Sequence, residues 1–203
     1  MRLFIALDID EAIRGKIRTF LDGVRGFAPD ARWVRPESLH VTLKFIGERP
    51  PETVDAIKSA LSHAKAAPIE LAFRGYGFFP TAKAARVFWI AIQSGPQLSA
   101  IAAAIDDATA KLGVNREDRS FSPHLTLARR GEGSGSPRWN KGDSPNRTFQ
   151  RLSEKLAALP SPDFGTMTAR EFFLYQSQLS REGSRYTKLE AFPLRKGDAG
   201  HGH

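Results

Sequence analysis

Apolar and polar residues alternate without a break in the segment LHVTLKF, residues 39–45. Successive side chains on a strand point to opposite faces, so this pattern predicts a β-strand with one buried face and one polar face. The apolar positions are Leu39, Val41, Leu43 and Phe45. The polar positions are His40, Thr42 and Lys44. A histidine and a threonine therefore share the polar face of the predicted strand.

Apolar spacing elsewhere predicts strands that alternate with helices. Helices are expected after Asp10, which can cap one, after Pro50 and Pro51, after Pro96, and over residues 149–159. Further strands are expected at residues 2–9, 69–79, 86–92, 121–130, 169–179 and 186–194.

The strand expected at residues 121–130 carries a second copy of the first pattern. The matching residues are His124, Leu125, Thr126 and Leu127, against His40, Val41, Thr42 and Leu43. Predicted helices flank each copy, so we interpret residues 1–95 and 96–195 as a weak internal repeat. This repeat predicts an α+β fold with a single bilobal domain over residues 1–195. Two pseudo-symmetric lobes, each a mainly antiparallel sheet with helices outside, are expected to face each other across a central cleft.

Two segments lack apolar periodicity. Residues 131–147, rich in Gly, Ser and Pro, are expected to form a flexible loop directly after the second motif. This loop is either a lid that offers Arg138, Trp139 or Lys141 to a substrate, or a disordered insertion. The tail, residues 196–203, contains His201 and His203 and is expected to be disordered rather than a metal site.

Charge and composition narrow the function. The 203 residues carry 30 Lys and Arg against 22 Asp and Glu, a net charge of +8, which favours a polyanionic partner such as nucleic acid. No cysteine is present, which excludes disulfides and thiolate metal sites. The N-terminal apolar run is too short for a signal peptide or a membrane span, so we expect a cytoplasmic protein that is not bound to membranes. No ligand-spaced acidic or histidine cluster accompanies either motif, so neither a metal nor a cofactor is expected.

The two motifs suggest acid–base chemistry at phosphorus. Histidines with an ordinary pKa near 6.5 can serve as general base and general acid at neutral pH. Threonine hydroxyls can donate hydrogen bonds to phosphoryl oxygens. Attack and departure in phosphoryl transfer are roughly in line, so a base on one lobe and an acid on the other fit that reaction.

The chain resembles the 2H phosphoesterase superfamily, which is named for two His-x-Thr motifs. Within it, the chain is similar to the bacterial RNA 2′,3′-cyclic phosphodiesterases, also called 2′-5′ RNA ligases. The resemblance rests on RLFIALDID, WVRPESLHVTLKFIGE, SPHLTLARR and GSRYTKLEAFPL, nearly end to end. It implies that RNA ends with a 2′,3′-cyclic phosphate are opened to a 2′-phosphomonoester without a metal. His40 would be the proton donor, His124 the proton acceptor, and Thr42 and Thr126 the phosphate-binding hydroxyls.

One arginine position is ambiguous. The resemblance favours Arg129 as a substrate-binding residue, whereas strict alternation places Arg130 on the face of His124 and Thr126. We therefore name both residues and favour Arg129.

Three functions remain as alternatives: the cyclic phosphodiesterase, a 2′-5′ RNA ligase that runs the reverse chemistry, and a non-catalytic module that binds RNA or nucleotide phosphate. A module that only binds phosphate has no need of two titratable histidines, which disfavours that alternative. No nucleotide-activating lysine motif or P-loop supports the ligase. A monomer is expected. Four aromatic residues could stack on bases or belong to the core, namely Tyr76, Phe78, Phe79 and Trp89.

Overall fold

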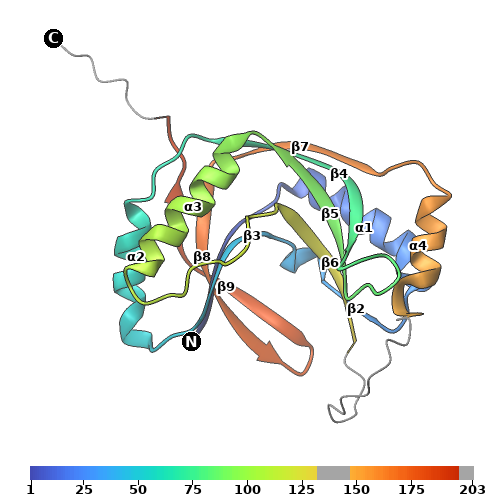
Figure 1. Cartoon of the computed structure of the whole chain (residues 1–203), viewed down its shortest axis with the longest axis horizontal. Helices are drawn as coiled ribbons and strands as arrows, with labels where there is room; N and C mark the ends of the chain where they lie inside the picture. The colour runs from blue at the N-terminus through green and yellow to red at the C-terminus, as the bar shows by residue number, and fades with distance from the viewer. Residues whose placement is uncertain (132–146, 197–203) are drawn as a thin grey trace.

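The computed structural model describes residues 1–131 and 147–196, and in these ranges two antiparallel sheets are flanked by helices (Figure 1). Sheet A has the strand order β3-β1-β8-β9, and sheet B has the order β2-β6-β5-β4-β7. The strands of sheet A are β1 (Arg2–Leu7), β3 (Val41–Glu48), β8 (Glu171–Ser180) and β9 (Gly183–Pro193). Those of sheet B are β2 (Ala31–Trp33), β4 (Ile69–Phe79), β5 (Val87–Ser94), β6 (His124–Arg130) and β7 (Asp163–Ala169).

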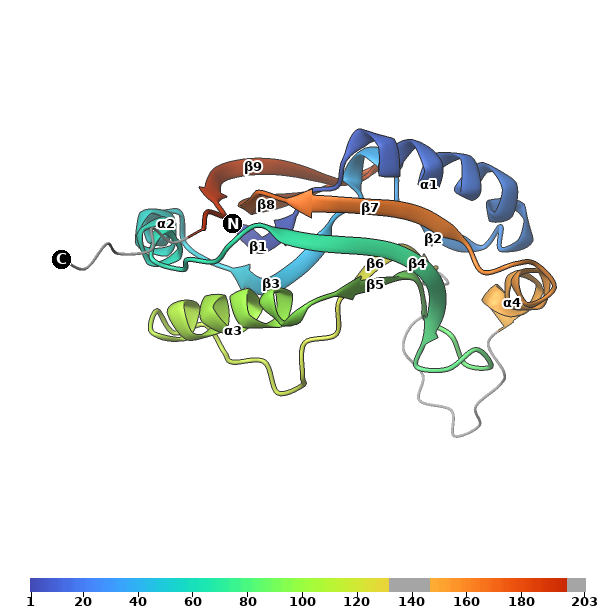
Figure 2. The same ribbon diagram turned by 90° about the horizontal axis from the view of Figure 1, so that it is seen from above.

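Four α-helices cover the outer faces of the sheets. They are α1 (Glu11–Val24), α2 (Val54–Ser62), α3 (Pro96–Ala110) and α4 (Gln150–Ala157). Short 3-10 turns are η1 (Arg25–Phe27), η2 (Pro36–Ser38), η3 (Pro51–Thr53) and η4 (Arg147–Phe149). Helices α2 and α3 lie on the side of sheet A, whereas α1 and α4 lie on the side of sheet B (Figures 1 and 2). Apolar residues of both sheets and all four helices form one continuous core.

The two sheets share an order of strands. In sheet A the motif strand β3 borders β1, and β1 borders β8; in sheet B the motif strand β6 borders β5, and β5 borders β4. In both sheets the third strand, β8 or β4, comes from the half of the chain that does not contain the motif strand of that sheet. Each sheet is therefore assembled from both halves. The repeat boundary between residues 95 and 96 stays a prediction of the sequence.

The predicted α+β architecture of two antiparallel sheets with outer helices is confirmed. The sequence pattern missed β2, which has only three residues, and β7, in which glycine and threonine dilute the apolar alternation.

The strict alternation predicted for residues 39–45 is wrong beyond Leu43. Thr42 pairs with Ala6 and Lys44 with Ile5, so Leu43 is an extra residue that forms a β-bulge. A bulge inverts the parity of the side chains that directly follow it. Lys44 is consequently buried, with 2% of its surface exposed, and Phe45 is 57% exposed.

The second motif strand has the same bulge at the same place. Thr126 pairs with Trp89 and Ala128 with Phe88, so Leu127 is the extra residue of β6. Leu127 and Ala128 both lie in the core. Parity is inverted here too, and this decides where the following arginines lie.

Candidate active site

The two His–Thr pairs lie on strands that contact each other although they belong to different sheets. His40 directly precedes β3 in sheet A, and His124 is the first residue of β6 in sheet B. Strands β3 and β6 are in contact. The opposite faces of both strands are anchored in the core by Val41, Leu125 and their neighbours. We call the two sheet surfaces that carry His40, Thr42, His124 and Thr126 the motif faces.

Both histidines are held by the same backbone contact. The Nδ1 atom of His40 is 2.8 Å from the carbonyl oxygen of Ser38, and Nδ1 of His124 is 2.7 Å from that of Ser122. A carbonyl can only accept, so Nδ1 carries the proton and donates it in both rings. Nε2 is then the atom of each neutral imidazole that can take a proton from a substrate or, once protonated, give one.

His40 lies in an aromatic environment. Its ring centroid is 4.8 Å from that of Phe4 and 5.2 Å from that of Tyr186, which meets it edge-on at 90°. Burial lowers the pKa of His40 and so does the charge of Arg129, while the hydrogen bond to Ser38 and the charge of Asp8 raise it; the net direction is below the ordinary value. The neutral form of His40 is thus favoured at neutral pH.

His124 is exposed and borders a tryptophan. Its ring centroid is 6.1 Å from that of Trp89 at an interplanar angle of 61°. Trp89 lies on the motif face because it pairs with Thr126. Gly77 makes this position possible, since a Cβ at residue 77 would overlap the indole ring.

Of the two predicted arginines, Arg129 lies on the motif face. It pairs with Val87, and residues 87, 89 and 91 of β5 share the side that faces away from the core. Its charge contributes to the lowered pKa of His40, so the arginine of one sheet acts on the histidine of the other. Arg130 points to the opposite side, and its backbone N–H donates to the carbonyl of Arg86 at 2.8 Å. The bulge at Leu127 causes this reversal of the strict alternation.

Lys44, expected on the polar face with His40, binds elsewhere. Its Nζ donates to Oδ1 of Asp106 and to the carbonyl of Asn115, both at 2.6 Å, and lies 3.3 Å from the carboxylate of Glu117. These contacts tie β3 to α3 and to the connection that leads from α3 to His124. Lys44 therefore has a structural role.

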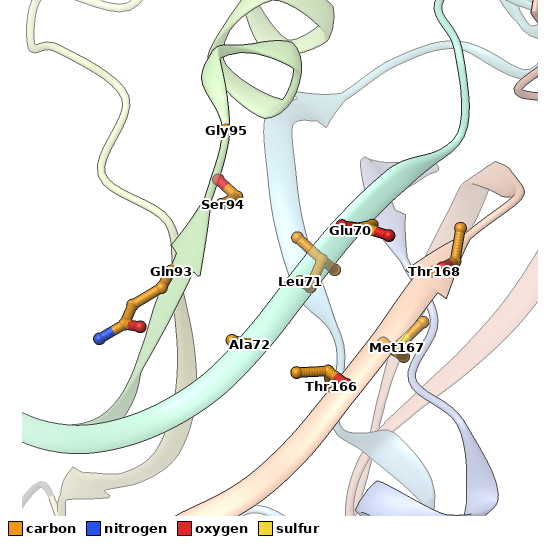
Figure 3. Close-up of a pocket in the computed structure, with 9 residues that line it drawn as sticks. All are labelled: Glu70, Leu71, Ala72, Gln93, Ser94, Gly95, Thr166, Met167 and Thr168. Carbon is orange, nitrogen blue, oxygen red and sulfur yellow. The ribbon is translucent and has the colours of Figure 1, made fainter.

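A cavity of about 430 Å³ borders His40 and is also lined by Asp8, Arg14 and Lys188. A larger hollow of about 640 Å³ lies on β4, β5 and β7 and contains neither histidine (Figure 3). Gln93, Ala72 and Thr166 stand side by side across these three strands in the hollow. The smaller cavity is the one that adjoins a candidate catalytic group.

The aromatic candidates divide between core and surface. Tyr76 and Phe78 are partly buried against the core, and Phe79 is half exposed at the end of β4. Trp89 alone of the four borders a motif histidine. The sequence pattern did not indicate the three aromatic residues around His40, which are Phe4, Tyr175 and Tyr186. They come from β1, β8 and β9, and only the pairing of these strands brings them together.

Some expectations fall outside the described residues. These expectations concern the loop with Arg138, Trp139 and Lys141 and the tail with His201 and His203. Within residues 1–131 and 147–196, no three His, Asp or Glu side chains are grouped so that they could hold a metal ion. In the same ranges no helix combines the length and the apolar character needed to cross a bilayer.

Comparisons with known proteins show the family and the fold to which the chain is similar. The family described as LigT like phosphoesterase matches the chain twice, over residues 7–89 and 90–186. An RNA 2′,3′-cyclic phosphodiesterase of Archaeoglobus fulgidus is 33% identical over 192 residues, which are 95% of this chain and 99% of that protein. A crystal structure from Thermus thermophilus is 30% identical with a TM-score of 0.75, covering 97% of this chain and all (100%) of that one. The crystal structure of E. coli LigT complexed with 3′-AMP is 26% identical with a TM-score of 0.74, covering 96% and 98%.

Proposed function

Because the chain belongs to the LigT-like phosphoesterase family, we propose that it hydrolyses the terminal 2′,3′-cyclic phosphodiester of RNA to a 2′-phosphomonoester. One observation carries the proposal: two His-x-Thr motifs with matching bulges and matching histidine anchors stand on two contacting strands of different sheets. The name of the Archaeoglobus relative supports the RNA substrate. The net charge of +8 suits a polyanion.

The reaction needs two proton transfers and no covalent intermediate. Water attacks phosphorus while Nε2 of His124 takes its proton. The bond from phosphorus to the 3′-oxygen breaks, and Nε2–H of His40 gives that oxygen a proton. The hydroxyls of Thr42 and Thr126 donate to the non-bridging oxygens, and Arg129 balances their charge. The products are a 2′-phosphate and a free 3′-hydroxyl.

Substrate binding itself favours the required protonation of His40. In the free protein, burial and the charge of Arg129 lower its pKa. The cyclic phosphodiester is an anion, and an anion beside an imidazole raises its pKa. His40 therefore gains its proton together with the substrate and loses it to the leaving oxygen.

The decisive experiment is hydrolysis of an oligoribonucleotide that ends in a 2′,3′-cyclic phosphate, carried out in excess EDTA. Wild-type protein should give a single product, the 2′-phosphate, identified by phosphorus NMR against 2′- and 3′-phosphate standards. His40→Ala and His124→Ala should each lower the single-turnover rate roughly 100- to 10,000-fold, because each removes one proton transfer. Circular dichroism checks that both variants are folded.

Four outcomes would contradict the proposal. A variant that keeps near wild-type rates would refute the two-histidine mechanism. A dominant 3′-phosphate would show that the leaving oxygen is the 2′-oxygen, so that the ring binds the other way round. Activity that disappears in EDTA and returns with Mg²⁺ would mean that a metal takes part. Formation of 2′-5′ linked RNA from the same substrate and a 5′-hydroxyl strand would favour the ligase.

A further inference from the structure

Asp8 is a carboxylate in the cavity beside His40, and the proposed reaction gives it no role. Its Oδ1 accepts from the N–H of Ile9 at 2.9 Å and from Nη2 of Arg14 at 2.7 Å, and its Oδ2 accepts from Nζ of Lys188 at 2.6 Å. Burial opposes ionisation, but these hydrogen bonds and the charges of Lys188 and Arg14 hold the pKa of Asp8 below its usual value. Asp8 is therefore ionised at neutral pH.

Arg14 connects Asp8 to the turn that holds His40. Its side chain is buried and its charge is compensated by hydrogen bonds. It donates to Asp8, to the carbonyl of Ile9 at 3.2 Å, to the carbonyl of Pro36 at 2.5 Å and to Glu11. Pro36 begins η2, and this turn ends at Ser38, whose carbonyl accepts from Nδ1 of His40. One guanidinium thus fixes both the carboxylate and the support of the histidine.

The sheet register places Asp8 beside His40, whereas the residue at the corresponding position beside His124 is uncharged. Leu7 pairs with Val41 in sheet A, so Asp8 and His40 are the next residues of that antiparallel register. In sheet B the equivalent partner of His124 is Ala91. The two motifs have the same anchors and the same bulges. The residue opposite the histidine is charged in one motif and apolar in the other.

Several other groups face the same cavity, and their charges are mixed. Arg14 reaches it from α1, Glu37 from η2, and Tyr175, Tyr186 and Lys188 from β8 and β9. Arg129 acts on His40 from β6 and disfavours a positive imidazole. The charge of Asp8 favours the positive imidazole, and it also adds to the effect of burial in raising the pKa of Tyr175. The charge of Asp8 therefore influences the protonation of two side chains that line the cavity, His40 and Tyr175.

We propose that Asp8, held by Arg14 and Lys188, is a positioning residue that favours the protonated form of His40 and so supports its part as proton donor. The inference rests on the proposed function, because only the proposed reaction makes His40 a proton donor. The interaction between Asp8 and His40 is independent of any reaction. In this arrangement the charge of Asp8 partly offsets the burial and the charge of Arg129, which lower the pKa of His40, whereas the partner of His124 is the uncharged Ala91.

NMR titration of His40 in the protein without substrate tests the interaction. Asp8→Asn keeps the shape and the oxygen acceptor but removes the charge, so the pKa of His40 should fall. Lys188→Met removes a cation from the other side of Asp8, and the pKa should rise. Glu11→Gln is the matched control, because Glu11 pairs with Arg14 at 2.9 Å but lies outside the cavity, and it should leave the titration unchanged.

The pH profile of turnover separates positioning from a merely structural role. A donor must be protonated, so its rate falls as pH rises through its pKa. A lower pKa in Asp8→Asn moves that fall to lower pH. Turnover should drop about tenfold at pH 8 and recover towards the wild-type rate near pH 6. Thermal unfolding followed by circular dichroism checks that the variant is folded.

An unchanged His40 titration in Asp8→Asn would overturn the inference, and so would a rate loss that is equal at all pH values. Failure of the proposed function has a different signature. In that event wild-type protein does not hydrolyse cyclic-phosphate RNA, whatever the three titrations give.

Discussion

The two motif histidines have the same backbone anchor but different surroundings. His40 is enclosed by Phe4 and Tyr186, with Asp8 opposite it, whereas His124 is exposed beside Trp89 with Ala91 opposite it. Two similar local sequences therefore place their histidines in different environments. The protonation of an imidazole depends on its burial and on the charges near it, and these come from other strands.

At the scale of single residues, Arg129 and Arg130 should differ in function although they are neighbours. Arg129→Gln removes a charge from the motif face and should lower kcat/KM roughly 10- to 100-fold, because the cation that we propose as the partner of the phosphoryl group is lost. Arg130→Gln is the matched control on the opposite side and should change kcat/KM less than twofold. Steady-state kinetics on the cyclic-phosphate oligonucleotide measure both.

A second measurement on Arg129→Gln needs no substrate. The charge of Arg129 lowers the pKa of His40, so its removal should raise that pKa in an NMR titration. Equal losses of activity in the two arginine variants would contradict the face assignment made from the bulge.

At the scale of elements, one extra residue in each motif strand decides which side chains reach the site. The bulges at Leu43 and Leu127 turn Lys44 and Ala128 into the core and bring Phe45 and Arg129 to the motif faces. Lys44 becomes a buried cation whose partner is Asp106 on α3. The bulge therefore couples the shape of the motif strand to the position of a helix from the other half of the chain.

Loss of the partner of Lys44 should be costly. Asp106→Ala leaves a buried ammonium without its closest carboxylate, and we expect the free energy of unfolding to fall by about 3 kcal/mol. Urea denaturation measures it. Asp107→Ala is the matched control on the same helix: Asp107 pairs with Arg116 in an exposed bridge, and its loss should leave the free energy of unfolding nearly unchanged.

The double variant Lys44→Met with Asp106→Leu separates charge from packing. Replacing both partners by apolar residues removes the unpaired charge, so most of the lost stability should return. If Asp106→Ala is no more destabilising than Asp107→Ala, the buried pair does not stabilise the fold as described.

At the scale of the whole molecule, the two halves of the chain are interlocked. Sheet A combines β1 and β3 with β8 and β9, and sheet B joins β4 and β5 to β6 and β7. The motif strands β3 and β6, one from each half, are in contact. The expected monomer and the expected boundary at residue 95 stay predictions.

Neither half should therefore fold alone. The fragment with residues 1–95 keeps β1 paired with β3 and β4 paired with β5, and each is an isolated two-stranded piece of marginal stability. Far-UV circular dichroism and amide NMR spectra of fragments 1–95 and 96–195 should show unfolded chains, with the full chain as the folded control. A dispersed spectrum from one fragment would show that it is a domain by itself.

The sequence by itself determined most of the elements, the α+β class and the four motif residues. These follow from local rules, because alternation, helical spacing and capping residues are read within a few neighbouring positions. The repeat of His-x-Thr then pointed to a pair of groups that act together. The strands β2 and β7 escaped these rules, since one is too short and the other is weakly apolar.

Only the tertiary structure showed that Arg129 and not Arg130 lies on the motif face, that Lys44 is buried in the core and that Asp8 lies beside His40. The physical reason is the same in all three cases. A bulge is defined by the partner strand, so a single strand's pattern carries no trace of the extra residue. The charge felt by a buried histidine likewise comes from residues distant in sequence, which the pairing of β1 with β3 and the packing of α1 bring to it.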